Sequence, residues 1–208
     1  MQKLIDGLVK FRKGDFEAHR DLFKGLKIQQ KPHTLFITCS DSRVDPNMIT
    51  GTLPGELFII RNIANLVPPY RETPEYASTT SAIEYAVLVL GVENIIVCGH
   101  SNCGGCAACL NASGILSGLP HTRKWMELAD PVRDRVIREI PADEPEAREW
   151  IMEQANAAEQ QIHLMTYPYI LEKVQAGRLT LSSWHYIIET GEVFIYDSAQ
   201  KEFLLANG

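Results

Sequence analysis

Short runs of apolar and β-branched residues, separated by segments of helical period, constrain the fold of this 208-residue chain most strongly. Three runs predict buried strands, at residues 34–38, 56–61 and 94–98. Between the second and third strands we expect a helix from Thr73 or Pro74 to Leu90, with Gly91 just past its end. Strands that alternate with helices indicate an α/β fold, with a central and largely parallel sheet flanked by helices.

The remaining segments add helices to this pattern and one further pair of strands. The predicted helices lie around residues 122–140, with a break at Pro131, and around residues 145–166. The predicted strand pair lies at residues 179–188 and 192–197, around Thr190–Gly191. Two short amphipathic helices are expected in the first thirty residues. We therefore expect a single domain over residues 1–208, with residues 1–30 as an N-terminal helical arm and residues 31–208 as the α/β core.

Charge and hydropathy exclude several classes of function. The chain has 20 Lys and Arg against 26 Asp and Glu, a net charge of −6 that argues against a nucleic-acid partner. Its most apolar window, residues 83–98, is interrupted by Glu84 and Glu93, so no membrane span is expected. Asp6 and Lys10 fall where a signal peptide needs an unbroken apolar region. We expect a cytoplasmic protein, and its odd number of five cysteines suits ligands or nucleophiles better than disulfides.

Two polar loops with metal-binding side chains follow the predicted strands. Cys39 follows the first strand, and His100 and Cys103 follow the third, three positions apart. The carboxyl ends of parallel strands meet at one edge of a sheet, where ligands bind in open α/β folds. Two thiolates and one imidazole favour zinc, and three protein ligands leave a fourth position open, as in catalytic sites. The alternative is that Cys39 is a buried core residue and His100 an ordinary loop histidine.

Asp41 and Arg43 follow Cys39 at alternate positions, so in an extended turn their side chains project to the same side. An arginine can hold a carboxylate through two hydrogen bonds and so keep it ionised beside the predicted metal. The alternative interpretation is a surface ion pair that contributes under about 1 kcal/mol. Its position next to a predicted ligand favours a role in the site.

The other cysteines offer a competing hypothesis. Cys103–Gly–Gly–Cys106 has the spacing of a thiol–disulfide oxidoreductase motif at the start of a helix. That hypothesis leaves Cys39 and the Asp41–Arg43 pair without a role, so it ranks below the metal site. Neither of the two common nucleotide-binding glycine motifs occurs in the chain.

The segment Cys39–Ser–Asp–Ser–Arg43, together with His100–Ser–Asn–Cys103–Gly–Gly, resembles the signature of the β-class carbonic anhydrases. Further segments resemble that family as well, at residues 54–62, 64–70, 81–85 and 91–105. The resemblance implies one Zn²⁺ per chain on Cys39, His100 and Cys103. It also implies reversible hydration of carbon dioxide to bicarbonate and a proton, by attack of zinc-bound hydroxide. Asp41, held by Arg43, would accept a hydrogen bond from that hydroxide and orient it.

The resemblance also suggests residues for the substrate. Gln30 and the backbone N–H of Gly104 would contact substrate oxygen. The apolar wall for carbon dioxide would be formed by Phe58, Ile63 and Tyr85, some of them from a partner subunit. A homodimer or a larger even-numbered homo-oligomer is implied, with the N-terminal helices packing across the partner.

One position indicates the subgroup within this family. Phe36 stands where one subgroup of the family has the tryptophan of a second bicarbonate site, which indicates the plant-like subgroup. Two other functions remain alternatives: hydrolysis of carbonyl sulfide or carbon disulfide on the same zinc site, and a non-catalytic zinc or thiol-redox protein. His33 and Tyr85 are candidates for the proton shuttle, His33 because it lies near the first motif in the sequence.

Overall fold

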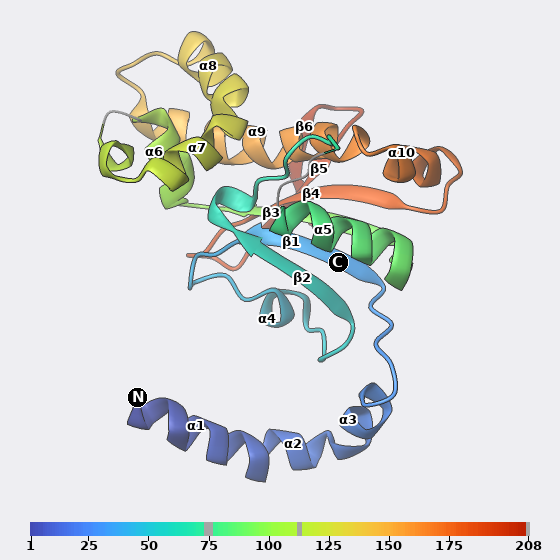
Figure 1. The fold of residues 1–208 in the computed structure, drawn as a ribbon. Helices are drawn as coiled ribbons and strands as arrows, with labels where there is room; N and C mark the ends of the chain where they lie inside the picture. Colours follow the sequence, from blue (N-terminus) through green and yellow to red (C-terminus); the bar gives the residue numbers. More distant parts are fainter. Residues whose placement is uncertain (73–76, 112–113, 207–208) are drawn as a thin grey trace. The chain divides into compact units, whose positions relative to one another are not determined.

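The computed structural model describes residues 1–72, 77–111 and 114–206, and it divides into two compact units, Met1–Lys31 and Pro32–Gly208 (Figure 1). The first unit is helical and consists of α1 (Gln2–Lys13), α2 (Asp15–Ala18) and α3 (Arg20–Leu26). The rings of Phe11, Phe16 and Phe23 contact one another, with centroids 5.1–6.2 Å apart. These aromatic contacts hold the three helices together, where the sequence predicted two. Further apolar side chains of α1 are exposed, namely Leu4, Ile5, Leu8 and Val9.

The second unit is built on a six-stranded sheet with the order β2-β1-β3-β4-β5-β6. Its strands are β1 (Thr34–Cys39), β2 (Leu57–Asn62), β3 (Asn94–His100), β4 (Thr180–Tyr186), β5 (Val193–Asp197) and β6 (Glu202–Leu205). Strands β2, β1, β3 and β4 run parallel, and β5 and β6 continue the sheet in antiparallel pairing. The largely parallel sheet predicted from the sequence is confirmed.

Helices fill the connections between the strands. They are α4 (Pro46–Thr50), α5 (Ser78–Glu84), α6 (Gly104–Leu110), α7 (Pro120–Met126), α8 (Asp130–Glu139), α9 (Pro145–Met165) and α10 (Pro168–Gln175). Four short segments complete them: η1 (Ile63–Asn65), η2 (Tyr85–Leu90), η3 (Ile115–Gly118) and η4 (Glu127–Ala129). Of these, η2 continues α5 as a π-helix and ends at Gly91, whose φ of 68° suits a glycine.

Two buried clusters form the core of the second unit. The first joins side chains of β1 and β3, such as Leu35, Ile37 and Val97, to apolar side chains of α5, η2, α9 and α10. The second lies beyond the carboxyl ends of β1 and β3, beneath α6, α7 and α8, and includes Cys39 and Cys103. Helices therefore pack over the edge of the sheet at which β1 and β3 end, and they bury Cys39 and Cys103 there.

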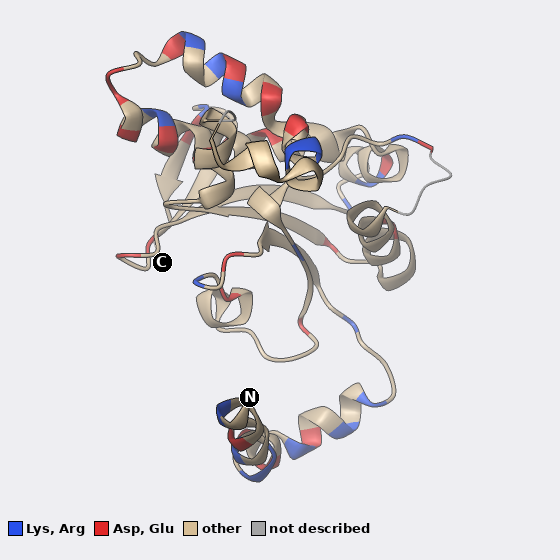
Figure 2. Ribbon diagram, turned by 60° about the vertical axis from the view of Figure 1, so that its left-hand side comes forward, with Lys and Arg blue, Asp and Glu red and all other residues tan. Residues whose placement is uncertain are grey.

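Acidic and basic side chains are mixed on the surface of α8. Residues of both signs alternate along α8 (Figure 2). Within the described ranges, no helix has both the length and the apolar character needed to cross a bilayer.

Most predicted elements are present, with differences at their ends. β3 extends two residues beyond the predicted strand and takes in His100. The helix predicted at residues 122–140 is divided by η4, and Pro131 lies in the first turn of α8, where a proline is tolerated. The predicted helix start at Thr73 or Pro74 lies outside the described residues. Helices α4 and α10 and strand β6 were not predicted.

Candidate metal centre

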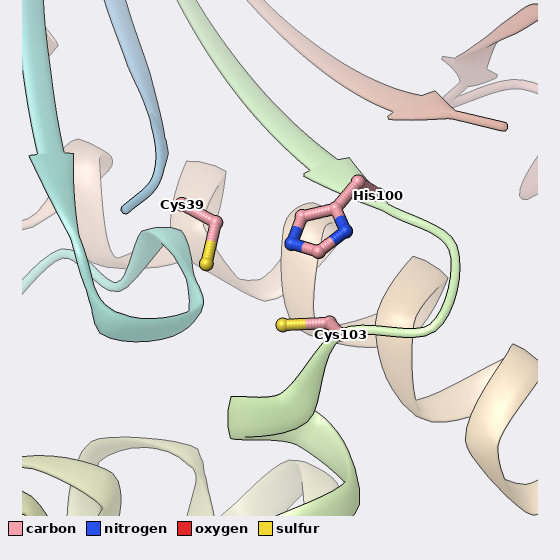
Figure 3. Close-up of side chains that lie close together, drawn as sticks. All are labelled: Cys39, His100 and Cys103. Atoms are coloured by element: carbon pink, nitrogen blue, oxygen red, sulfur yellow. The ribbon is translucent and has the colours of Figure 1, made fainter. Parts of the chain in front are cut away.

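Three metal-binding side chains meet at the carboxyl edge of the sheet. Cys39 ends β1, His100 ends β3, and Cys103 lies directly before α6. β1 and β3 are paired and parallel, with Thr38 opposite Cys98, so the last residues of both strands lie next to each other at the carboxyl edge of the sheet. One ligand atom of each of the three lies within 4.8 Å of the others. Figure 3 shows the two sulfur atoms and the imidazole ring directed toward a common centre.

The imidazole of His100 has only one of its nitrogens occupied by the protein. Its Nδ1 lies 3.0 Å from the carbonyl oxygen of Ser101, so Nδ1 carries the hydrogen and donates it. Its Nε2 is left with a lone pair, buried and without a hydrogen-bond partner among the described residues. Metal-bound histidines commonly have this arrangement, with the second ring nitrogen bound to a carbonyl oxygen or carboxylate. The residues therefore fit a metal ion at Nε2.

The two thiols are buried beside each other and hold their protons when no cation is present. The Cys103 thiol, together with burial, raises the pKa of Cys39 to about 12. The neighbouring Cys106 thiol raises the pKa of Cys103. Two thiolates side by side in a dry site repel each other, and a divalent cation removes that penalty. The donor set is therefore suited to bind a cation with release of protons.

Asp41 and Arg43 form the predicted pair next to these donors. Arg43 donates from Nε to Oδ1 of Asp41 at 2.9 Å and from Nη2 to Oδ2 at 2.7 Å. These hydrogen bonds from Arg43 hold the pKa of Asp41 well below its usual range. The Oδ2 atom lies 3.9 Å from Nε2 of His100. An ionised, oriented carboxylate thus stands beside the position that a metal ion would occupy.

A second arginine, Arg61 of β2, was not identified from the sequence. It donates from Nε to the carbonyl oxygen of Cys39 at 3.1 Å and from Nη2 to that of Asp41 at 2.5 Å. The register of β1 and β2, which places Thr38 opposite Arg61, brings this side chain to the loop. Arg61 therefore fixes the backbone that carries the first ligand.

A cavity of about 320 Å³ opens beside Cys39 and Asp41. Most of its other lining residues are apolar or glycine: Ile63, Gly104, Gly105, Ala108, Ile115, Leu116, Leu119 and Met126. Two residues that the family resemblance suggested for the substrate, Ile63 and Gly104, thus lie at the cavity. The apolar side chains of η3 and α7 were not predicted, because nothing in their spacing distinguishes a cavity wall from ordinary core.

A strained backbone segment directly follows Ile63, which lines this cavity. Ala64 and Asn65 both have positive φ angles, 61° and 49°, which non-glycine residues seldom adopt. The carbonyl oxygen of Ile63 accepts a hydrogen bond from Trp125 Nε1, and that of Ala64 accepts one from Asn156 Nδ2, both at 2.9 Å. These two side chains stabilise the strained segment, and they fix Ile63 at the cavity wall.

The remaining predicted substrate residues do not line this cavity. The rings of Phe58 and Tyr85 contact each other, with centroids 6.1 Å apart, and Phe58 packs against the first core cluster. Gln30 belongs to the first unit, Met1–Lys31. Their roles stay predictions. His33 precedes β1, whereas Cys39 ends that strand, which spans roughly 20 Å. Nearness in sequence is therefore no argument for His33 as a proton shuttle.

Comparisons with known proteins give a consistent result. The family model described as carbonic anhydrase matches residues 34–193. A carbonic anhydrase of Helicobacter pylori (strain J99) is 40% identical over 194 residues, which cover 92% of this chain and 88% of that protein. A carbonic anhydrase of Pseudomonas aeruginosa is 39% identical over 204 residues, with 98% and 91% covered.

Solved structures of beta-carbonic anhydrases resemble the chain as well. The structure of the beta-carbonic anhydrase CcaA superposes with a TM-score of 0.93 at 40% identity, covering 99% of both chains. One of two tetrameric beta-carbonic anhydrases from Sordaria macrospora has a TM-score of 0.80 at 31% identity, covering 92% of this chain and 94% of that one.

Proposed function

The chain belongs to the β-class carbonic anhydrase family, and on that basis we propose that Cys39, His100 and Cys103 bind one zinc ion per chain. The reaction is the reversible hydration of carbon dioxide to bicarbonate and a proton. The observation that carries the zinc assignment is the lone pair of His100 Nε2, buried next to two thiols. Two sulfur ligands and one nitrogen ligand suit zinc, and three protein ligands leave a fourth position for the reaction.

When bound, zinc lowers the pKa of a coordinated water molecule from about 16 toward about 7 and so supplies a nucleophile near neutral pH. Asp41 is placed to orient that nucleophile, since its Oδ2 lies 3.9 Å from the ligand atom of His100. As an ionised carboxylate, Asp41 only accepts hydrogen bonds, so it would receive one from an O–H group held beside His100. Arg43 fixes the carboxylate through two hydrogen bonds and prevents it from turning.

Carbon dioxide is small and without charge, and the apolar cavity beside Asp41 suits it. We assign Ile63 to its wall and the backbone N–H of Gly104 to a substrate oxygen. Gln30, Phe58 and Tyr85 are retained as proposed substrate residues on the family resemblance alone. For Phe58 and Tyr85, contact with substrate would involve the cavity of a second copy, because they do not line their own.

We propose that the functional unit is a homodimer or a larger even-numbered assembly. β2 and η2 carry exposed apolar side chains, namely Ile59, Tyr85, Leu88 and Val89. β2 is also an edge strand of the sheet. Edge strands with exposed apolar residues invite pairing with another chain. A second copy is the proposed partner, and the tetrameric relatives from Sordaria macrospora support this. The exposed apolar side chains of the arm are proposed to pack on that copy.

A cytoplasmic location is part of the same proposal. All five cysteines are free thiols, and all are buried. Free thiols are typical of reducing compartments.

Metal analysis combined with stopped-flow carbon dioxide hydration tests the proposed site. The wild-type protein is expected to contain one zinc per chain and to be active. Cys39→Ala is expected to lose both, whereas Cys98→Ala, which changes a buried cysteine of β3 that is absent from the ligand cluster, keeps both. An active Cys39→Ala variant with full zinc content would contradict the assignment.

A further inference from the structure

The peptide unit that joins Asn102 to Cys103 is held at both of its polar ends. Its carbonyl oxygen, on Asn102, accepts a hydrogen bond from Nη2 of Arg43 at 2.9 Å. Its N–H group, on Cys103, donates to Oε1 of Glu153 at 2.8 Å. Asn102 itself has a φ of 55°, in the left-handed region that asparagine adopts more readily than most non-glycine residues. Two side chains therefore hold this peptide unit in place immediately before the third proposed ligand.

Glu153 is an unusual residue to find at this place. It lies on α9 and is 4% exposed. A buried carboxylate is costly unless hydrogen bonds satisfy both of its oxygens, and an apolar side chain would fill the same space without that cost. Packing alone therefore does not explain a carboxylate here. Its hydrogen bond from the N–H group of Cys103 does, because an apolar side chain could not accept that bond.

His185 of β4 satisfies the second oxygen of this carboxylate. Its Nε2 lies 3.2 Å from Oε2 of Glu153, and the imidazole is fully buried. Its Nδ1 lies 3.4 Å from the amide nitrogen of Gln154, which can only donate, so Nδ1 accepts and Nε2 carries the hydrogen. The ring packs edge-on against Trp150, with centroids 4.9 Å apart. His185 is thus fixed as a donor to Glu153.

We propose that Glu153 and His185 are positioning residues of the metal centre, acting on Cys103 through its backbone. The proposal rests on the zinc site described above. Glu153 holds the N–H group of Cys103, and His185 holds Glu153, so the Cys103 thiol stays directed toward Cys39 and His100. Without the carboxylate, that N–H group would be buried and unpaired, and rotation of the peptide would relieve this cost.

The same peptide links this pair to Asp41. Arg43 uses one nitrogen, Nη2, both for Oδ2 of Asp41 and for the carbonyl oxygen of Asn102. Rotation of the peptide therefore removes one of the contacts that orient the arginine. Loss of Glu153 is expected to disturb the metal ligand and the orienting carboxylate together, although Glu153 bonds directly to neither side chain.

The test compares substitutions at Glu153 with one at Glu149, an exposed residue one turn earlier on the same helix. Zinc affinity is measured by competition with a chromophoric chelator, and cobalt(II) replaces zinc for the visible spectrum. Glu153→Leu is expected to weaken zinc binding about 10- to 100-fold, the usual effect of losing an outer partner of a ligand, and to alter the cobalt spectrum. Glu149→Leu is expected to match the wild type in both.

Two further variants separate positioning from folding. Glu153→Gln keeps an oxygen that can accept from Cys103, but its amide nitrogen would face the donor Nε2–H of His185. It is therefore expected to recover part of the zinc affinity that Glu153→Leu loses. His185→Phe keeps an aromatic ring against Trp150 but removes the donor, so it is expected to weaken zinc binding by less than Glu153→Leu. Circular dichroism shows which variants are folded.

The outcomes are distinguishable. A folded Glu153→Leu variant with wild-type zinc affinity and cobalt spectrum overturns the proposal. Should that variant not fold, His185→Phe decides, and wild-type values for it overturn the proposal equally. A wild-type protein that binds no zinc refutes the metal site itself, and the positioning roles with it.

Discussion

Gly105 and Ala64 approach so closely that a methyl group on Gly105 would lie 2.9 Å from the Cβ atom of Ala64. The same methyl group would lie 3.2 Å from Cγ2 of Ile63. Ala64 cannot easily retreat, because Asn156 holds its carbonyl oxygen. The absence of a side chain at Gly105 therefore allows α6 to pack against Ala64 and against its neighbour Ile63, which lines the cavity.

We predict that Gly105→Ala lowers both stability and activity. Overpacking of this kind costs about 1–3 kcal/mol of unfolding free energy. The displaced Ile63 should also reduce kcat/KM, because the cavity beside Asp41 changes shape. Gly118→Ala is the matched control, since nothing lies within 4 Å of a methyl group there. Thermal unfolding and stopped-flow hydration measure both effects, and equal values for the two variants would show that the close approach is unimportant.

Asp41→Asn is predicted to retain zinc but to lose about 10²-fold in kcat, the order expected for loss of an oriented acid–base group. The amide can donate as well as accept, so it no longer fixes the direction of the nucleophile's lone pair. Asp45→Asn serves as the control, because Asp45 caps α4 and asparagine caps a helix equally well. Wild-type turnover by Asp41→Asn at full zinc content would refute the role given to Asp41.

Zinc binding is predicted to release protons and to weaken as the pH falls. The pKa of Cys39 is raised to about 12 and that of Cys103 is raised as well, so in the metal-free protein both thiols are protonated near neutral pH. Metal binds the thiolates, and protons therefore compete with zinc more strongly at lower pH. Calorimetric titrations at pH 6–8, in buffers with different ionisation enthalpies, should show at least two protons released per zinc, one from each thiol. Binding without proton release would contradict the assignment of both thiols.

Leu88→Glu is predicted to dissociate the proposed homo-oligomer. Leu88 lies in η2 and is 53% exposed, and a charge in an apolar interface leaves an unpaired buried group. Ile162→Glu, at a residue of α9 that is 60% exposed, is the matched control. Sedimentation equilibrium gives the mass of each. If Leu88→Glu keeps the mass of the wild type, the proposed interface is wrong.

The sheet and the ligand cluster were predictable because both depend on local patterns. Apolar runs marked β1 and β3, and the rule that parallel strands end at one edge placed Cys39 near His100. The partners of the site depend instead on pairings distant in sequence. Glu153 lies 50 positions from Cys103, and its spacing on α9 is that of an ordinary helical residue. Strand β6 escaped prediction because its four residues are mostly exposed, so no buried apolar run marks them.

The separation of the ligands along the chain has a consequence for the metal-free protein. His100 lies 61 positions after Cys39 (100 − 39), so a zinc ion bound to both would close a long loop. Backbone pairing of β1 with β3 already closes that loop in the metal-free protein. Folding has therefore already lost the conformational entropy of loop closure, and metal binding costs no more of it. The metal should therefore bind reversibly to a site that is already folded, and folding should not depend on it. Chelation would then yield an inactive but folded protein, which regains its activity when zinc is returned.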